Sequence, residues 1–200
     1  LPKDYVFLNY LRCHDDIGWG LDYATLQQEG IEERSHKKYL NDYFQGFAGE
    51  SNSRGVLYNE DPVTGDARFC GTTASMCGIE KAGFEKNKTA MDKAIQLDVM
   101  LHAYMFMQSG IPVIYSGDEI GQVNDYSYKN DPDKAPDSRY IHRGAMNWDR
   151  AAMSGNARTV EGKLNKRLLQ LEKIRKTEKA FMTNADTWTV DTWDNSILCI

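Results

Sequence analysis

The sequence lacks a long apolar stretch. No segment approaches the roughly 20 consecutive apolar residues that a helix needs to span a bilayer, and the longest, residues 94–107, is interrupted by Gln96, Asp98 and His102. A membrane role is therefore not expected. Residues 1–5 carry neither an initiator methionine nor the basic-then-apolar layout of a signal peptide, so we expect the chain to start inside a longer protein.

Cysteine and basic charge are also scarce. The cysteines form no CxxC pair, have no regular spacing and lack an accompanying histidine ladder, which gives little support to a zinc site or a disulfide framework and favours a reducing cytoplasm. The net charge of -5 is not that of a nucleic-acid-binding protein, because phosphate binding needs clustered Lys and Arg. Neutral substrates fit better. The cysteines are Cys13, Cys70, Cys77 and Cys199.

A short strand and a long irregular excursion are predicted in the N-terminal part. Residues 5–11 are aromatic and β-branched, which predicts a buried strand that runs into the polar residues 12–16. Periodicity is weak over residues 17–73, where only residues 35–46 are typical of a helix, with Ser35 as the N-cap.

A long helix and a second strand follow. Residues 86–109 repeat apolar side chains at helical spacing, and Gly110 comes next as a C-terminal stop. The apolar run 111–115 then predicts a strand. Strand, excursion, helix and strand in this order are typical of a βαβ unit, so we expect the two strands to be parallel.

The remaining chain predicts a loop, a helix and a hairpin. Residues 124–138 are polar and contain Pro132 and Pro136, which predicts a surface loop. Residues 161–181 return to helical spacing, with basic residues near the end where the helix dipole favours them. Residues 187–200 read as a hairpin with a polar turn.

The triplet His14-Asp15-Asp16 is the first candidate site. It follows the strand predicted at residues 5–11, and barrel enzymes place catalytic side chains at the C-terminal ends of their strands. Such a triplet is also typical of a solvated turn, and the triplet alone does not decide between the two.

A second motif follows one long helix later and supplies the context: Gly110-Ile111-Pro112-x-x-Tyr115-x-Gly117-Asp118-Glu119-Ile120-Gly121. Together with His14-Asp15, it resembles the seventh and eighth barrel strands of the α-amylase superfamily, glycoside hydrolase family 13. Within that superfamily the chain is most similar to amylosucrases and sucrose hydrolases, from Tyr5 to about Trp148. The matching stretches are His14-Asp15-Asp16-Ile17-Gly18-Trp19, Arg54-Gly55-Val56, Thr64-Gly65-Asp66-x-Arg68-x-x-Gly71-Thr72, Asn124-Asp125 and Asp137-Ser138-Arg139-Tyr140-x-His142-Arg143.

The resemblance implies an α/β fold in which residues 1–182 are the C-terminal part of a (β/α)8 TIM barrel, with strands 7 and 8 and their helices. An inserted subdomain would occupy residues 20–74, and residues 183–200 would begin a C-terminal β-sandwich domain. The implied activity is that of a retaining enzyme that hydrolyses or transfers glucose from sucrose or an α-glucan through a covalent glucosyl intermediate. That chemistry requires no metal and no organic cofactor.

The resemblance also gives roles to five residues. Asp15 would stabilise the positive charge of the oxocarbenium-like transition state, and His14 would hydrogen-bond sugar hydroxyls. Arg139 would close the glucose pocket through a salt bridge to an aspartate upstream of this chain. Arg68 and Asp16 would line the acceptor side, although a solvated loop charge is an equally good interpretation of Arg68.

Two other acidic groups have a structural interpretation. Asp118 and Glu119 look like the carboxylate pair of a glycosidase, but in the superfamily the nucleophile and the acid/base come from strands 4 and 5, so a structural role is favoured. The acidic residues of the predicted loop could bind calcium, but they lack EF-hand spacing, and a solvated loop at the pocket mouth is favoured. These residues are Asp125, Asp131, Asp133 and Asp137.

With the nucleophile and the acid/base upstream, these 200 residues alone are expected to have no glycosidase activity and to need the remainder of the barrel as a partner. Two alternatives stay open. One is a non-catalytic carbohydrate-binding or scaffold module derived from such a barrel. The other is a different superfamily member, such as an α-glucosidase, a trehalose synthase or an α-amylase.

Overall fold

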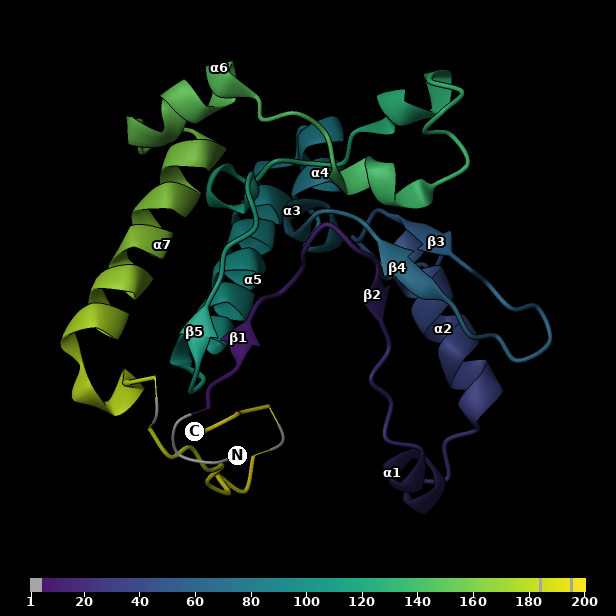
Figure 1. Cartoon of the computed structure of the whole chain (residues 1–200), viewed down its shortest axis with the longest axis horizontal. Helices are drawn as coiled ribbons and strands as arrows, with labels where there is room; N and C mark the ends of the chain where they lie inside the picture. The colour runs from purple at the N-terminus through teal and green to yellow at the C-terminus, as the bar shows by residue number, and fades with distance from the viewer. Residues whose placement is uncertain (1–4, 184, 195) are drawn as a thin grey trace.

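The computed structural model describes residues 5–183, 185–194 and 196–200. Two groups of elements lie beside each other in Figure 1, one around a pair of long helices and one around a small sheet. The first group contains β1 (Leu8–Asn9), α5 (Lys88–Met107), β5 (Ile111–Pro112) and α7 (Val160–Thr177), and the second contains β2 (Ile17–Gly18), α2 (Glu33–Gln45), β3 (Val56–Tyr58) and β4 (Arg68–Cys70).

The strands β1 and β5 pair in parallel, as the predicted βαβ order requires. Leu8 lies opposite Ile111, and the Ile111 and Val113 amides donate to the Phe7 and Asn9 carbonyls at 2.8 Å. Helix α5 is the last element of the long connection between the two strands, and it runs alongside them in Figure 1. The fold is therefore an α/β arrangement with parallel strands. The described residues form no closed barrel, and the barrel stays a proposal.

Both strands are shorter and more exposed than predicted. Only Leu8–Asn9 and Ile111–Pro112 are paired, instead of residues 5–11 and 111–115. The expectation of a buried first strand is wrong for this chain, because the Tyr5, Phe7 and Leu8 side chains are more than 60% exposed (66%, 63% and 62%). Within the described residues β1 has one neighbouring strand, so its other edge has no partner and its apolar side chains have little to pack against.

The structure confirms the two long helices that the periodicity of the sequence predicts. Helix α5 begins after Asn87, whose side chain accepts from the Ala90 amide, and α7 begins after Thr159, whose hydroxyl caps the Gly162 amide. Their facing sides share an apolar core, and each such buried side chain contributes roughly 1.5–3 kcal/mol relative to exposure. The buried members are Met105, Phe106, Leu168 and Leu171, with Ala94, Ile95 and Leu164 in an adjoining cluster.

Gly162, in the first turn of α7, has no space for a side chain. A Cβ at this position would lie 2.0 Å from the backbone oxygen of Asn156, so alanine would displace the turn that precedes the helix. Alanine is intrinsically the better helix former by about 1 kcal/mol. We nevertheless expect Gly162→Ala to lower the free energy of unfolding by about 1–3 kcal/mol, the usual cost of overpacking, as measured by urea unfolding.

Gly83 provides the matched control for this substitution. It also lies in a helix, α4 (Ile79–Phe84), but a Cβ there would meet only the Met91 Cε atom, at an ordinary contact distance of 3.6 Å. Gly83→Ala should therefore raise stability, by up to about 1 kcal/mol. If the two variants change stability in the same direction, the steric argument for Gly162 is wrong.

The small sheet has the order β2-β4-β3, with both pairs antiparallel. Trp19 stacks on Phe44 of α2 at 4.8 Å between ring centroids, and Phe44 contacts Phe69 of β4 at 5.3 Å. These aromatic rings hold α2 against the sheet. That the predicted 20–74 segment is an insertion into a barrel stays a prediction.

The start of α2 differs from the prediction. The helix begins at Glu33, and its N-cap is Glu32, whose carboxylate accepts from the Arg34 and Ser35 amides. Ser35 is therefore inside the first turn and is not the cap. The end is as predicted, since Gly46 adopts a left-handed φ of 87° as the C-cap. An additional short helix, α1 (Tyr23–Gln28), precedes it and begins after Asp22.

The segment predicted as a loop at residues 124–138 is more structured than expected. It contains a 3-10 turn, η2 (Tyr126–Asn130), in which the Tyr128 side chain is buried. Asp125, Asp131 and Asp137 use their side chains to cap turns within it. The other short elements are α3 (Thr73–Met76), η1 (Asp118–Ile120), η3 (Ser138–His142), α6 (Trp148–Ala151), η4 (Ala152–Gly155) and η5 (Lys179–Phe181).

The C-terminal residues contain one antiparallel bridge, between Val190 and Cys199. The bridge agrees with the predicted hairpin, whose polar turn includes Asn195, which lies outside the described residues. The assignment of residues 183–200 to a separate β-sandwich domain stays a prediction. Among the helices of the described ranges, none combines the length and the apolar character needed to cross a membrane.

Candidate functional site

The turn after β1 and the 3-10 helix η3 meet at Asp15. Asp15 Oδ1 lies 3.2 Å from Arg139 Nη1 and 3.7 Å from Arg143 Nη2, and Oδ2 lies 3.2 Å from His14 Nε2. The side chain of Asp15 is about half exposed (49%). Three of the predicted site residues, His14, Asp15 and Arg139, are thus in one cluster with a carboxylate accessible from solvent.

Arg139 is fixed by its own turn as well as by Asp15. Its Nε and Nη2 donate to the two carboxylate oxygens of Asp137, both at 2.9 Å, and its guanidinium lies 4.8 Å from the ring centre of Tyr58 in β3. These hydrogen bonds lower the pKa of Asp137 and raise that of Arg139. The predicted salt bridge of Arg139 to an upstream aspartate stays a prediction, because that aspartate would lie outside this chain. Within the chain, the guanidinium contacts the carboxylates of Asp15 and Asp137.

Asp16 and Arg68 form a looser contact on the sheet side. Arg68 Nη1 is 3.9 Å from Asp16 Oδ2, and the Arg68 side chain is 58% exposed, against 16% for Asp16. Surface pairs of this kind contribute little to stability. Arg68 therefore lies near the cluster, and its exposed guanidinium has donors available to a ligand.

The backbone carbonyl of His14 is held by His142 and Arg143, at the end of η3. This carbonyl accepts from Arg143 Nε at 2.7 Å and lies 3.3 Å from His142 Nε2. Burial lowers the pKa of His142 to about 4, so the ring is neutral at physiological pH and one tautomer can donate to His14. The His14 ring itself is exposed and accessible to a ligand, with its Nε2 3.2 Å from Asp15 Oδ2.

A buried charge cluster behind this turn was not identified from the sequence. Arg12 Nε and Nη2 each lie 2.8 Å from Asp118 Oδ1, and both side chains are about 2% exposed. Arg12 Nη1 also donates to the His142 carbonyl at 3.4 Å. Arg12 therefore connects the end of β1 to the loop after β5 and to η3. The sequence feature that could have pointed to Arg12 is its position directly after the predicted strand and just before the His14-Asp15 pair.

Two more buried ionisable groups complete this cluster. His102 Nδ1 lies 2.9 Å from both the carbonyl and Oδ1 of Asp98, and His102 Nε2 is 4.0 Å from Asp118 Oδ2. Burial opposes the charged imidazole, but Asp98 outweighs it, so the pKa of His102 is raised. Burial also raises the pKa of Asp118, although Arg12 acts against this. With His102 protonated, two cations face two carboxylates.

Asp118 and Glu119 do not form a catalytic pair in this geometry. Asp118 is buried against Arg12 and accepts from the Thr73 hydroxyl at 3.2 Å, and Glu119 accepts from the Gly117 amide at 2.7 Å. Both carboxylates are used within the fold, which supports the structural interpretation.

The acidic loop does not gather its carboxylates around one point. Asp131 pairs with Lys134 and Asp137 with Arg139, and Asp125 caps Ser127. Among the described residues, the single group of three or more His, Cys, Asp or Glu ligands is Cys13, His14 and Asp15. A calcium site in the loop is therefore not supported.

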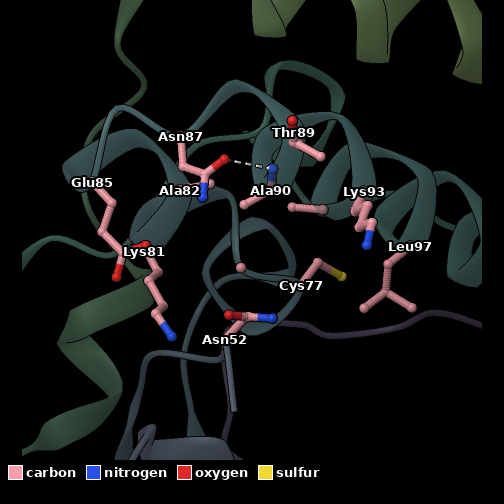
Figure 2. Close-up of a pocket in the computed structure, with 12 residues that line it drawn as sticks. Asn52, Cys77, Lys81, Ala82, Glu85, Asn87, Thr89, Ala90, Lys93 and Leu97 are labelled. Carbon is pink, nitrogen blue, oxygen red and sulfur yellow. Dashed lines mark hydrogen bonds between the residues drawn. The ribbon is translucent and has the colours of Figure 1, made fainter. Parts of the chain in front are cut away.

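Two hollows beside helix α5 lie away from this cluster. One, of 310 Å³, lies between α4 and the N-terminal half of α5, and Figure 2 shows its lining, which includes Lys81, Glu85, Asn87 and Lys93. The other, of 870 Å³, separates α5 from the C-terminal segment and is mainly apolar, with Tyr104 and Trp188 in its lining. Neither contains a predicted site residue.

No protein-family model matches the chain. Its structure is similar to the crystal structure of sucrose 6F-phosphate phosphorylase from Thermoanaerobacter thermosaccharolyticum, with a TM-score of 0.60 and 20% sequence identity over 91% of this chain. The chain spans 31% of the length of that protein. At this identity the match establishes a common fold and leaves the activity open.

Proposed function

We propose that this chain contributes part of the active site of a retaining α-glucoside hydrolase or transglucosylase of the α-amylase superfamily, acting on sucrose or an α-glucan. The observation that carries the proposal is the contact between Asp15 and Arg139, which are 124 positions apart in the sequence. Arg139 was selected from the resemblance, and Asp15 from its position after a predicted strand together with the resemblance. The fold shared with a sucrose 6F-phosphate phosphorylase agrees with a sugar substrate.

In this proposal Asp15 acts on the transition state and does not form the covalent bond. Glycoside cleavage develops positive charge on the sugar ring, and a fixed carboxylate stabilises that charge more in the transition state than in the bound substrate. Arg139 and Arg143 hold Oδ1, which fixes the orientation of the carboxylate. The nucleophile and the acid/base would come from other parts of the protein.

The neighbouring residues would bind the sugar. His14 has an exposed ring next to Asp15 and would hydrogen-bond hydroxyls at the reacting glucose. Arg68, which is more exposed than Asp16, would offer its planar fork of donors to vicinal hydroxyls on the acceptor side. A double displacement of this kind uses no cofactor.

The test is sugar release by the full-length protein incubated separately with sucrose, maltose and soluble starch, each with and without inorganic phosphate. Fructose in excess of free glucose from sucrose would indicate transglucosylation, and equal amounts would indicate hydrolysis. A glucose phosphate that forms only with phosphate present would indicate phosphorolysis, as the name of the structural match suggests. Activity on maltose or starch alone would contradict the sucrose assignment.

The alternative of a non-catalytic module makes a different prediction. Such a protein would bind a glucan without releasing any product from the three substrates. Absence of turnover together with measurable binding to starch would therefore replace the enzyme proposal with the binding-module interpretation.

A further inference from the structure

We propose that Cys13, His14 and Asp15 form a binding site for a thiophilic divalent ion such as Zn²⁺, and that the ion inhibits the enzyme by occupying the Asp15 carboxylate. The proposed metal binding depends only on how these three side chains are arranged. The inhibition rests on the function proposed above.

The three ligand atoms already converge. One atom from each residue, the Cys13 sulfur, a His14 ring nitrogen and an Asp15 carboxylate oxygen, lies within 4.8 Å of the others. The Asp15 amide lies 3.4 Å from Cys13 Sγ in a hydrogen bond that brings the thiol back toward the carboxylate. Zinc with bond lengths of roughly 2.0–2.3 Å separates its tetrahedral ligands by about 3.5 Å, so the atoms need to close by about 1 Å.

The two oxygens of Asp15 have different surroundings. Oδ1 faces Arg139 and Arg143, whereas Oδ2 faces His14 Nε2 at 3.2 Å. A metal ion can therefore replace the contact between His14 and Oδ2 without breaking the arginine contacts. Both side chains are accessible, with 69% of the His14 and 49% of the Asp15 side chain exposed, so no rearrangement of the core is needed.

The local charge does not forbid a cation. Arg139 and Arg143 pair with Asp137 as well as with Asp15, and Arg68 faces Asp16, so three arginines are offset by three carboxylates. When the ion binds, the Cys13 thiol releases its proton to solvent and the thiolate adds a negative charge at the site. Sulfur and imidazole ligands select Zn²⁺ over Ca²⁺ and Mg²⁺, which prefer oxygen.

Such a site has three protein ligands and an open position, the arrangement of accessible zinc sites. Here the ion occupies the carboxylate that the proposed reaction needs, so the expected effect is inhibition. Sequence patterns of zinc sites in which the ligands are spaced apart, such as CxxC, do not detect this site, because its three residues are consecutive in the sequence.

The experiment uses Co²⁺ as a spectroscopic substitute for Zn²⁺, in a buffer free of thiols, with the full-length protein. We expect a thiolate-to-cobalt charge-transfer band that Zn²⁺ abolishes by displacement. Cys13→Ser should eliminate the band and weaken Zn²⁺ binding by at least about tenfold, since even partners outside the ligand set are worth that much. Cys199→Ser is the matched control, because it removes a partly exposed thiol in the C-terminal segment and should leave the band unchanged.

The inhibition is measured separately on the reaction found for the full-length protein. Zn²⁺ should inhibit the wild type and Cys199→Ser reversibly, with recovery on adding a chelator, and Cys13→Ser should need at least about ten times more Zn²⁺. A band that survives in Cys13→Ser, or no band in the wild type, overturns the metal site whatever the enzyme does. Binding with unaltered turnover overturns the inhibition. If the protein has no sugar activity, the cobalt spectrum still decides the metal site.

Discussion

Replacing Arg12 with alanine is expected to be the most destabilising single substitution around the candidate site. Arg12 is buried, and both contacts to Asp118 Oδ1 are 2.8 Å. Its removal leaves Asp118 and Asp98 with His102 as their one cationic partner among the described residues. Removing one partner of a buried pair costs about 3–5 kcal/mol.

Urea unfolding monitored by tryptophan fluorescence measures this loss. Arg158→Ala removes an equal charge from an exposed position and should change stability by less than about 0.5 kcal/mol. The double variant Arg12→Met/Asp118→Leu should recover part of the loss, because it removes both charges and leaves Asp98 with His102. A single Arg12→Ala variant as stable as Arg158→Ala would show that the cluster contributes no net stability.

Replacing Asp15 with asparagine is expected to reduce kcat of the full-length enzyme by about 10²–10³, the size of effect seen when one preorganised electrostatic group is removed from a transition state. Asparagine has the same shape, and its amide oxygen can still accept from Arg139, so the turn should keep its structure. The change removes the negative charge. The effect should therefore fall mainly on kcat and less on KM.

Asp118→Asn distinguishes this role from a structural one. It removes the charge of a carboxylate that Arg12 and Thr73 already hold in the interior, so it should lower stability while the folded enzyme retains its turnover below the melting range. Both variants are assayed with sucrose, with their unfolding curves measured in parallel. If only Asp118→Asn abolishes turnover, the chemistry belongs to the loop after β5 and the role proposed for Asp15 is wrong.

The elements that the sequence predicted well are those stabilised by their own neighbours. Helices α5 and α7 were expected at residues 86–109 and 161–181 and occur at Lys88–Met107 and Val160–Thr177. A helix makes its hydrogen bonds within itself and repeats its buried face every three or four residues, so local periodicity is sufficient. The cap of α2 was missed because Glu32 performs a task that serine more often has.

The strands were predicted less well because a strand is completed by partners elsewhere in the chain. Residues 5–11 have the composition of a buried strand, but only Leu8 and Asn9 are paired with another strand, and the Leu8 side chain is exposed to solvent. The sequence specified an apolar strand, and the number of its neighbours decided how much of it is paired and covered.

Local sequence patterns were enough to predict the two long helices α5 and α7, the parallel order of β1 and β5, and the residue types at the candidate site, including His14, Asp15 and Arg139. Tertiary packing was needed to show that Arg139 and Arg143 share one oxygen of Asp15, that the other oxygen faces His14, and that Arg12 contacts Asp118 behind them. The difference comes from the sequence separation of the contacting residues. Helical hydrogen bonds link residues four apart, whereas Arg12 and Asp118 are separated by 106 positions, and no local pattern specifies which distant charges meet.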